Sequence, residues 1–129
     1  MDGLTLGDLL QVAARVVGPD VVVRDPGLVV AALARVSAVA DGVEVYPTVA
    51  EKGAALLHSL VINGALASGN RPFALAACLA LMGLLDQPAG IPPDDAADLV
   101  TAIVTGRVEG VPEIAAALRG SRVDTPRRG

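Results

Sequence analysis

The sequence predicts an all-α fold, a helical bundle around one buried central helix, with a short β-hairpin inserted between helices. Three observations predict it. Helix-capping residues precede most apolar segments, and the apolar side chains that follow recur at the helical period. Apolar residues make up 53% of the 129 residues but aromatic residues only 2%, so the core consists of leucine, valine and alanine, which suit closely packed helices. Residues 36–46 break the helical pattern, which indicates the hairpin.

The first two helices have clear boundaries in the sequence. Thr5 and Asp8 have the spacing of a capping box, in which Thr5 is the N-cap of the first helix. Gly18-Pro19 ends that helix, because proline cannot continue it. Asp25-Pro26 is an N-cap followed by proline at the first helical position. It therefore predicts a second helix over residues 27–35.

A β-hairpin and a third helix come next. Asp41-Gly42 lies between valine and alanine residues, which indicates a short hairpin or flap with a tight turn. Thr48 and Glu51 form a second capping box and begin the third helix. Because the hairpin precedes the next loop by one helix, we expect it to fold back over that loop. The expected buried face of the third helix consists of Ala54, Ala55, Leu57, His58, Val61 and Ile62.

The second half of the chain predicts three further helices. Residues 63–69 form a loop of small residues, and the helix after it, roughly 70–85, is apolar nearly all round. Such a helix belongs at the centre of a bundle. Asp94 is expected to cap a helix that reaches Thr105. Pro112 begins a last short helix that ends near Arg119.

The net charge of −4 is unevenly distributed. Residues 1–118 hold six basic and thirteen acidic residues, a balance of −7, which argues against binding of DNA or another nucleic acid. We expect one helical domain over residues 1–119 and a disordered basic tail over residues 120–129, which have little to bury. The tail is either a solvated terminus or a binding segment for an acidic partner. It contains or adjoins four of the ten basic residues: Arg119, Arg122, Arg127 and Arg128.

No membrane segment is expected. The longest uncharged apolar stretch, residues 72–85, is shorter than the roughly 20 residues that span a bilayer. Residues 1–8 carry two acids and no basic region, so we expect no signal peptide and a cytoplasmic location. The single cysteine, Cys78, lies within the apolar stretch and is interpreted as a small buried hydrophobic residue.

Three parts of the chain resemble the Fic/Doc family, and more specifically the Doc toxins of toxin–antitoxin pairs. Residues 23–35 resemble the second helix of Doc proteins. Residues 46–63, with Tyr46-Pro47-Thr48 at their start, resemble the helix that leads into the active-site loop of the family. Gly69-Asn70, followed by a basic residue and an alanine-rich helix, resembles the end of that loop. The resemblance extends over residues 4–85 and implies the Fic/Doc helical fold.

The loop itself departs from the family pattern at three positions. The family usually has a histidine, then an acid four residues later, then Gly or Ala, Asn, Lys and Arg. Here Gly64 stands at the histidine position and Ser68 at the acidic position. Asn70 is kept, Arg71 replaces the lysine, and Pro72 replaces the second basic residue. In the family the histidine is the general base toward a protein hydroxyl, so no residue is assigned as catalytic here.

Phosphate binding is a separate expectation. The start of the helix at residue 70 presents unpaired N–H groups, Gly69 permits a close approach, and Arg71 can bond a phosphate with its guanidinium. We therefore assign nucleotide or phosphate binding to Ser68, Gly69, Asn70 and Arg71, while a solvated turn with a solvated Arg71 stays the alternative. The resemblance implies ATP or another nucleotide with magnesium as cofactor.

Two functions remain open at this point. The first is a Doc-like toxin component, whose family transfers phosphate or AMP to a protein hydroxyl; Doc toxins phosphorylate a translation elongation factor. It implies a small antitoxin protein as partner, and catalysis impaired by the change at Gly64. The second is a non-catalytic or repurposed Fic-fold protein that acts as a binding or scaffolding partner or carries out a different reaction. The only histidine, His58, is interpreted as structural, and no metal ligands are assigned.

Overall fold

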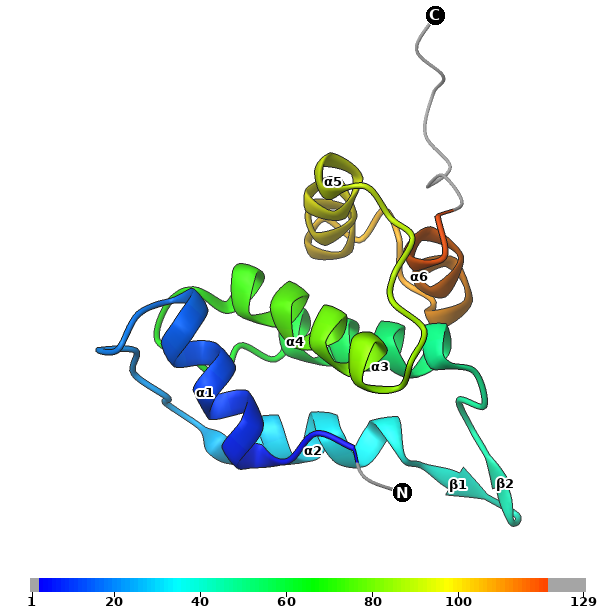
Figure 1. The fold of residues 1–129 in the computed structure, drawn as a ribbon, viewed down its shortest axis with the longest axis horizontal. Helices are drawn as coiled ribbons and strands as arrows, with labels where there is room; N and C mark the ends of the chain where they lie inside the picture. The colour runs from blue at the N-terminus through cyan, green and yellow to red at the C-terminus, as the bar shows by residue number, and fades with distance from the viewer. Residues whose placement is uncertain (1–2, 121–129) are drawn as a thin grey trace, which may run out of the picture.

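A computed structural model describes residues 3–120 and contains a helical bundle with one β-hairpin (Figure 1). The predicted all-α fold is confirmed. The elements in chain order are α1 (Leu6–Val16), α2 (Pro26–Val36), β1 (Val39–Ala40), β2 (Val43–Glu44), α3 (Val49–Ile62), α4 (Asn70–Leu84), α5 (Pro93–Val104) and α6 (Val111–Leu118).

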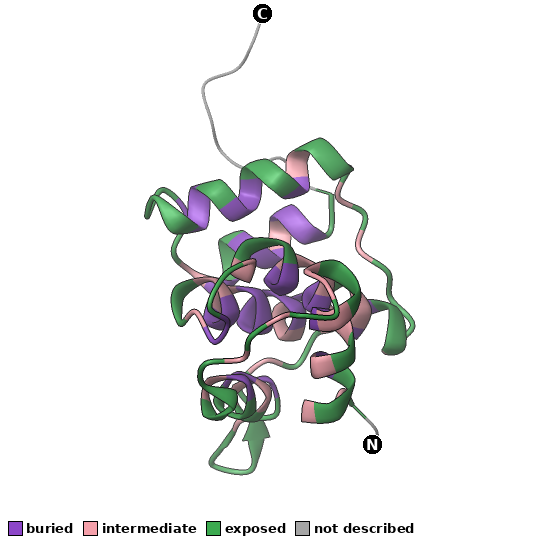
Figure 2. Ribbon diagram, turned by 90° about the vertical axis from the view of Figure 1, so that its left-hand side faces the viewer, coloured by how far each residue is buried: buried purple, intermediate pink, exposed green. Residues whose placement is uncertain are grey.

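Helix α3 is the centre of the bundle. Helices α2, α4, α5 and α6 all pack against it, while α1 packs against α4 and α2. Figure 1 shows α3 and α4 side by side, running in opposite directions, with α5 and α6 on one side of the pair. Buried residues gather in the middle of the molecule (Figure 2). The core is therefore built around α3.

Local sequence signals place the helix starts, as predicted. The Thr5 hydroxyl accepts the Asp8 N–H at 3.1 Å, and the Asp8 carboxylate accepts the Thr5 N–H at 3.0 Å. Thr48 and Glu51 make the same reciprocal pair at the start of α3. The Asp25 side chain caps α2, which has a proline in its first turn. Each cap satisfies N–H groups that a helix start otherwise leaves unpaired.

The hairpin also forms where it was predicted. Val39 pairs with Glu44 and Ala40 with Val43 in antiparallel register. Between them Asp41 and Gly42 have φ values of 53° and 76°. A two-residue turn of this kind requires positive φ at both central positions, which aspartate and glycine tolerate better than other residues.

The expected fold-back of the hairpin over the 63–69 loop is wrong. Lys52 forms an ion pair with Glu44 at 2.7 Å and donates to the Tyr46 carbonyl, which ties the hairpin to the first turn of α3. The loop follows the last turn of this 14-residue helix, about 20 Å further along its axis. Figure 1 shows the hairpin and the loop at opposite ends of α3. Strands of two residues are too short to bridge that distance.

Burial along α3 and α4 differs from the expectation. Leu84 on α4 is 51% exposed, so α4 is not buried nearly all round; its outer side faces solvent. Ile62, expected in the core, is 52% exposed, whereas Leu60, two residues earlier in the same turn, and Leu56 are fully enclosed. The helix with neighbours on most sides is α3 and not α4.

The C-terminal helices form close to their predicted positions. Asp94 is not the cap of α5: Pro92 is the N-cap, and Asp94 lies in the first turn, where its charge complements the helix dipole. Pro93 has the φ of a helix start and begins the helix two residues earlier than expected. Helix α6 contains Pro112 in its first turn, as predicted. Of the predicted tail, residues 121–129 lie outside the described residues.

No helix within residues 3–120 is long and apolar enough to cross a membrane.

The close approach of α3 and α4 depends on Gly53. A Cβ added to Gly53 would lie 2.8 Å from Met82 Cγ, closer than packed side chains allow, and 3.4 Å from Cys78 Sγ. Gly83, near the end of α4, has no other atom within 4 Å of such a Cβ. The two helical glycines therefore differ in the room available for a side chain and not in backbone conformation.

We expect Gly53→Ala and Gly83→Ala to change the free energy of unfolding in opposite directions. Alanine at residue 83 gains helix propensity and raises it by about 0.5–1 kcal/mol. Alanine at residue 53 gains the same propensity but overpacks the core, which costs about 1–3 kcal/mol. Urea unfolding of both variants measures the difference. Equal stabilisation by the two substitutions would contradict the close packing at Gly53.

Candidate functional site

The 63–69 loop is held by the segment that precedes α2. Val23 and Leu66 form an antiparallel β-bridge. The Arg24 N–H donates to the Ala65 carbonyl at 2.8 Å, and the Ala67 N–H donates to the Val22 carbonyl at 2.9 Å. The loop is therefore fixed by backbone pairing, although nothing in the sequence analysis indicated this contact.

Asn70 closes the loop from the other side. Its Oδ1 accepts the Leu66 N–H and its Nδ2 donates to the Leu66 carbonyl, both at 2.9 Å. The amide therefore pairs both polar groups of one loop residue, which lies in the core. Of the predicted site residues, Asn70 holds the loop in shape, and its side-chain amide is already engaged.

Gly69 fits its position for two independent reasons. It is the N-cap of α4 with φ 82°, in the left-handed region that favours glycine. A Cβ there would also lie 2.7 Å from Val17 Cγ2. No side chain caps α4, so the leading N–H groups of this helix have no side-chain acceptor. This arrangement leaves the helix start open to an anion.

Gly64, at the position where the family has histidine, is tightly enclosed. A Cβ at this residue would lie 2.9 Å from Asn70 Nδ2 and 3.2 Å from Asn70 Cγ. Any side chain at residue 64 must therefore displace the amide that fastens the loop.

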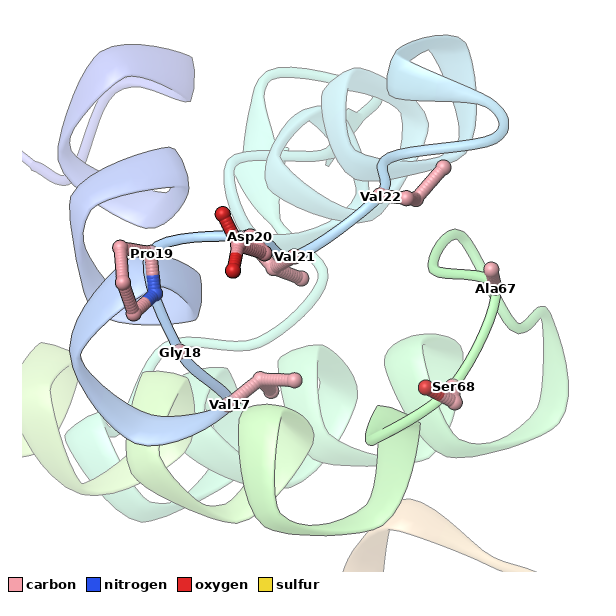
Figure 3. A pocket seen from close by; sticks show the side chains of 8 residues that line it. All are labelled: Val17, Gly18, Pro19, Asp20, Val21, Val22, Ala67 and Ser68. Carbon is pink, nitrogen blue, oxygen red and sulfur yellow. The ribbon is translucent and has the colours of Figure 1, made fainter.

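An open pocket of ≈ 260 Å³ lies beside the loop, between it and the turn after α1 (Figure 3). Ser68 directs its side chain into this space from the loop, opposite the 18–22 segment. Asp20 is the one acidic residue of the lining. Sequence reasoning missed Asp20, because Gly18-Pro19 was interpreted only as a helix end. The lining residues are Val17, Gly18, Pro19, Asp20, Val21, Val22, Ala67 and Ser68.

The structure brings only part of the predicted set together. Ser68 lines the pocket, and Gly69 begins α4 beside it. Arg71 lies in the first turn of α4 with an exposed side chain, but it does not line the pocket. Within residues 3–120, no group of three His, Cys, Asp or Glu residues is close enough together to hold a metal ion.

His58 does not line the pocket and is already hydrogen-bonded. Its Nδ1 is 3.1 Å from Arg35 Nη1, half-buried between α2 and α3. Burial lowers the pKa of His58, the nearby Arg35 charge lowers it further, and Glu109 offsets part of this effect. Cys78 is buried as expected, and burial raises its thiol pKa to about 12.

Asn70→Ala is expected to lower the free energy of unfolding by about 1–3 kcal/mol, because it leaves the N–H and carbonyl of a buried residue without partners. Asn63→Ala is the matched control: Asn63 is exposed, and its side chain makes no hydrogen bond within the described part of the chain. Urea unfolding compares the two. Equal effects would show that the Asn70 amide does not stabilise the loop.

A comparison with known proteins identifies the family. The chain is 37% identical over 115 residues to the protein named Toxin Doc of Mycolicibacterium smegmatis, and the match covers 88% of each chain. No family model and no solved structure matches the chain. The resemblance inferred from the loop and its flanking helices is confirmed: this chain belongs to the Fic/Doc family, as a relative of Toxin Doc.

Proposed function

We propose that the chain is the toxin component of a toxin–antitoxin pair whose loop still binds nucleotide phosphate, while its transferase activity is impaired. The observation that carries the impairment is Gly64: the position of the family's histidine has no side chain, and a Cβ there would meet the Asn70 amide. The toxin role rests on the name of the relative from M. smegmatis.

Three features support phosphate binding at Ser68, Gly69, Asn70 and Arg71. The start of α4 has no side-chain cap, so its N–H groups can donate to an anion. The Ser68 hydroxyl faces the pocket beside this helix start. Arg71, in the first turn, adds a guanidinium that has no ion-pair partner within residues 3–120. Asn70 contributes by fixing the loop backbone.

The proposed cofactor is ATP or another nucleotide with magnesium. The donors at the start of α4 fit a phosphate group. Magnesium usually keeps several waters and takes one or two carboxylates together with phosphate oxygens. Asp20 is the carboxylate of the pocket lining that fits such a set, since Ser68 stands where the family has an acid. Bound magnesium would neutralise phosphate charge.

Catalysis requires a base that reaches the attacking hydroxyl, and the loop offers none. His58, the one histidine of the sequence, contacts Arg35 and does not line the pocket. Loss of a general base typically costs about 10²–10⁴ in rate. We therefore expect binding without efficient transfer.

The partners follow from this assignment. We propose a small antitoxin protein as the physiological partner and a translation elongation factor as the macromolecule acted upon or bound. Such a target places the protein in the cytoplasm. The hairpin and the loop lie at opposite ends of α3, and the antitoxin is assigned to no particular face (Figure 1).

A second candidate function is a non-catalytic Fic-fold binding or scaffolding partner, or a protein repurposed for a different reaction. Residues 64, 68 and 72 have all changed, while the caps at Thr5 and Thr48 and the core remain intact. Random decay would damage the core as readily as the loop. This contrast favours retention of a folded protein for some use.

Nucleotide binding tests the first function. We expect calorimetry to detect binding of MgATP to the purified protein, and Arg71→Ala to weaken it about 10–100-fold, the range for a hydrogen bond to a charged group. Arg107→Ala removes an equally exposed charge from the α5–α6 connection and is expected to leave affinity unchanged. Absence of binding, or equal effects of the two substitutions, would contradict a phosphate site at α4.

Restoring the loop separates the two functions. We expect Gly64→His/Ser68→Asp/Pro72→Arg to transfer phosphate or AMP from labelled ATP to bacterial protein and to arrest growth on expression. The control Ser68→Asp/Pro72→Arg lacks the base and is expected to do neither. Circular dichroism checks that the histidine, which must displace Asn70, leaves the fold intact. A folded but inactive triple variant would favour the scaffolding function.

A further inference from the structure

Arg35, on the last turn of α2, connects this helix to α3 and to Tyr46, which follows the hairpin. Its Nε donates to the Tyr46 hydroxyl at 3.1 Å, and its Nη1 donates to Ser59 Oγ at 2.9 Å. The same Nη1 lies 3.1 Å from His58 Nδ1. The guanidinium carbon is 5.6 Å from the centre of the Tyr46 ring, within the range of a cation–π contact.

No carboxylate neutralises this half-buried cation. The one ion pair among residues 3–120 joins Lys52 and Glu44. Arg35 therefore depends on neutral acceptors: a phenol, a hydroxyl, an imidazole and, more distantly at 3.5 Å from Nη1, the Ala55 carbonyl. Each missing acceptor matters more here than it would beside a carboxylate, because a partly buried charge is costly without hydrogen bonds.

The imidazole can accept from Arg35 in only one protonation state. Arginine stays protonated and has donors alone, so His58 Nδ1 must present its lone pair. A protonated His58 carries a hydrogen on both ring nitrogens and cannot accept. Two charged groups act on this ring: Arg35 from α2, which disfavours its protonation, and Glu109 from the α5–α6 connection, which favours it.

Tyr46 transmits the state of Arg35 to the hairpin. It follows β2 by two residues and leads into α3. The hairpin has little packing of its own, since its strands have two residues each and Val43 is 66% exposed. Its placement depends on the Tyr46 contact with Arg35 and on Lys52, which pairs with Glu44 and donates to the Tyr46 carbonyl.

We propose that His58 is a pH-sensitive positioning residue for the hairpin: neutral His58 holds Arg35 against Tyr46, and protonated His58 releases it. In the neutral state Arg35 bonds both rings and keeps the hairpin fixed to the helical body. Protonation removes the acceptor at Nδ1 and brings two cations together, so that Arg35 leaves and the Tyr46 contact breaks. The device is independent of nucleotide binding at the 63–69 loop.

The protonation of His58 changes the folding stability with pH in a definite direction. The pKa of His58 is lowered by folding, so the unfolded chain binds a proton that the folded chain excludes. Stability from this site is complete above the ordinary histidine pKa of about 6.5 and is lost as the pH falls below it toward the folded pKa. Thr48 hydrogen bonds lower the pKa of Glu51 below 4.5, so the α3 cap titrates at lower pH.

The composition makes the test specific, because the chain has one histidine, one tyrosine and no tryptophan. NMR of the imidazole gives the His58 midpoint, and intrinsic fluorescence reports on Tyr46 alone. Amide exchange supplies an internal control: the Val45 N–H donates to Ala38 O in the hairpin and the Ala67 N–H to Val22 O in the loop, both at 2.9 Å.

From about pH 7.5 to pH 5, across the range in which histidine titrates, we expect Tyr46 fluorescence to change with the His58 midpoint. Over this range the protection factor of Val45 should fall about fivefold relative to Ala67, the order expected for one lost side-chain hydrogen bond. His58→Asn keeps a short acceptor near the Nδ1 position and does not titrate, so neither change should occur.

Tyr46→Phe is the second variant, read by amide exchange. It leaves His58 free to titrate but cuts the hydrogen bond to Arg35, so the Val45 amide should no longer follow the imidazole. The proposal is overturned if the wild-type hairpin does not respond at the His58 midpoint, or if the response persists in either variant. Should His58→Asn fail to fold, the wild-type and Tyr46→Phe data decide.

Discussion

The packing of α3 against α4 governs the rest of this molecule. The helices meet most closely at Gly53, where any side chain would overlap Met82, and α2, α5 and α6 complete the enclosure of α3. Because α3 is a rigid rod of 14 residues, its two ends are held about 20 Å apart. The hairpin enters at one end and the 63–69 loop leaves at the other. Helix α3 therefore keeps the proposed phosphate site and the hairpin apart.

Predictions from the sequence succeeded where a local rule sufficed. The capping boxes at Thr5 and Thr48 and the turn at Asp41-Gly42 each depend on residues within a few positions of one another. They failed where the burial or pairing of a residue depends on a segment that is distant in the sequence. Ile62 and Leu60 are both apolar, and only the position of neighbouring helices determines that one is exposed and the other buried. The pairing of Val23 with Leu66 has no signal in either segment alone.

The loop shows the same division. Its chemistry could be inferred from residue types: Gly64 cannot accept a proton, whatever its surroundings. The role of Asn70 could not, because an exposed ligand-binding amide and a loop-fastening amide look identical in sequence. The structure gives it two hydrogen bonds to Leu66. Asn70 therefore maintains the shape of the loop, together with Gly69, which starts α4.

Arg35 joins α2 to α3 without a carboxylate partner among residues 3–120. Burying a charge in this way costs free energy. Apolar residues would pack there at lower cost, because burying a cation loses its hydration. A cation bound only to neutral acceptors is, however, sensitive to the protonation of any one of them. A carboxylate partner would hold Arg35 across the range in which histidine titrates, whereas His58 holds it only when neutral. Arg35 itself lies on α2, and neither it nor its partners Tyr46, His58 and Ser59 line the pocket beside the loop. The proposals for the loop and for the hairpin rest on different atoms and can fail separately.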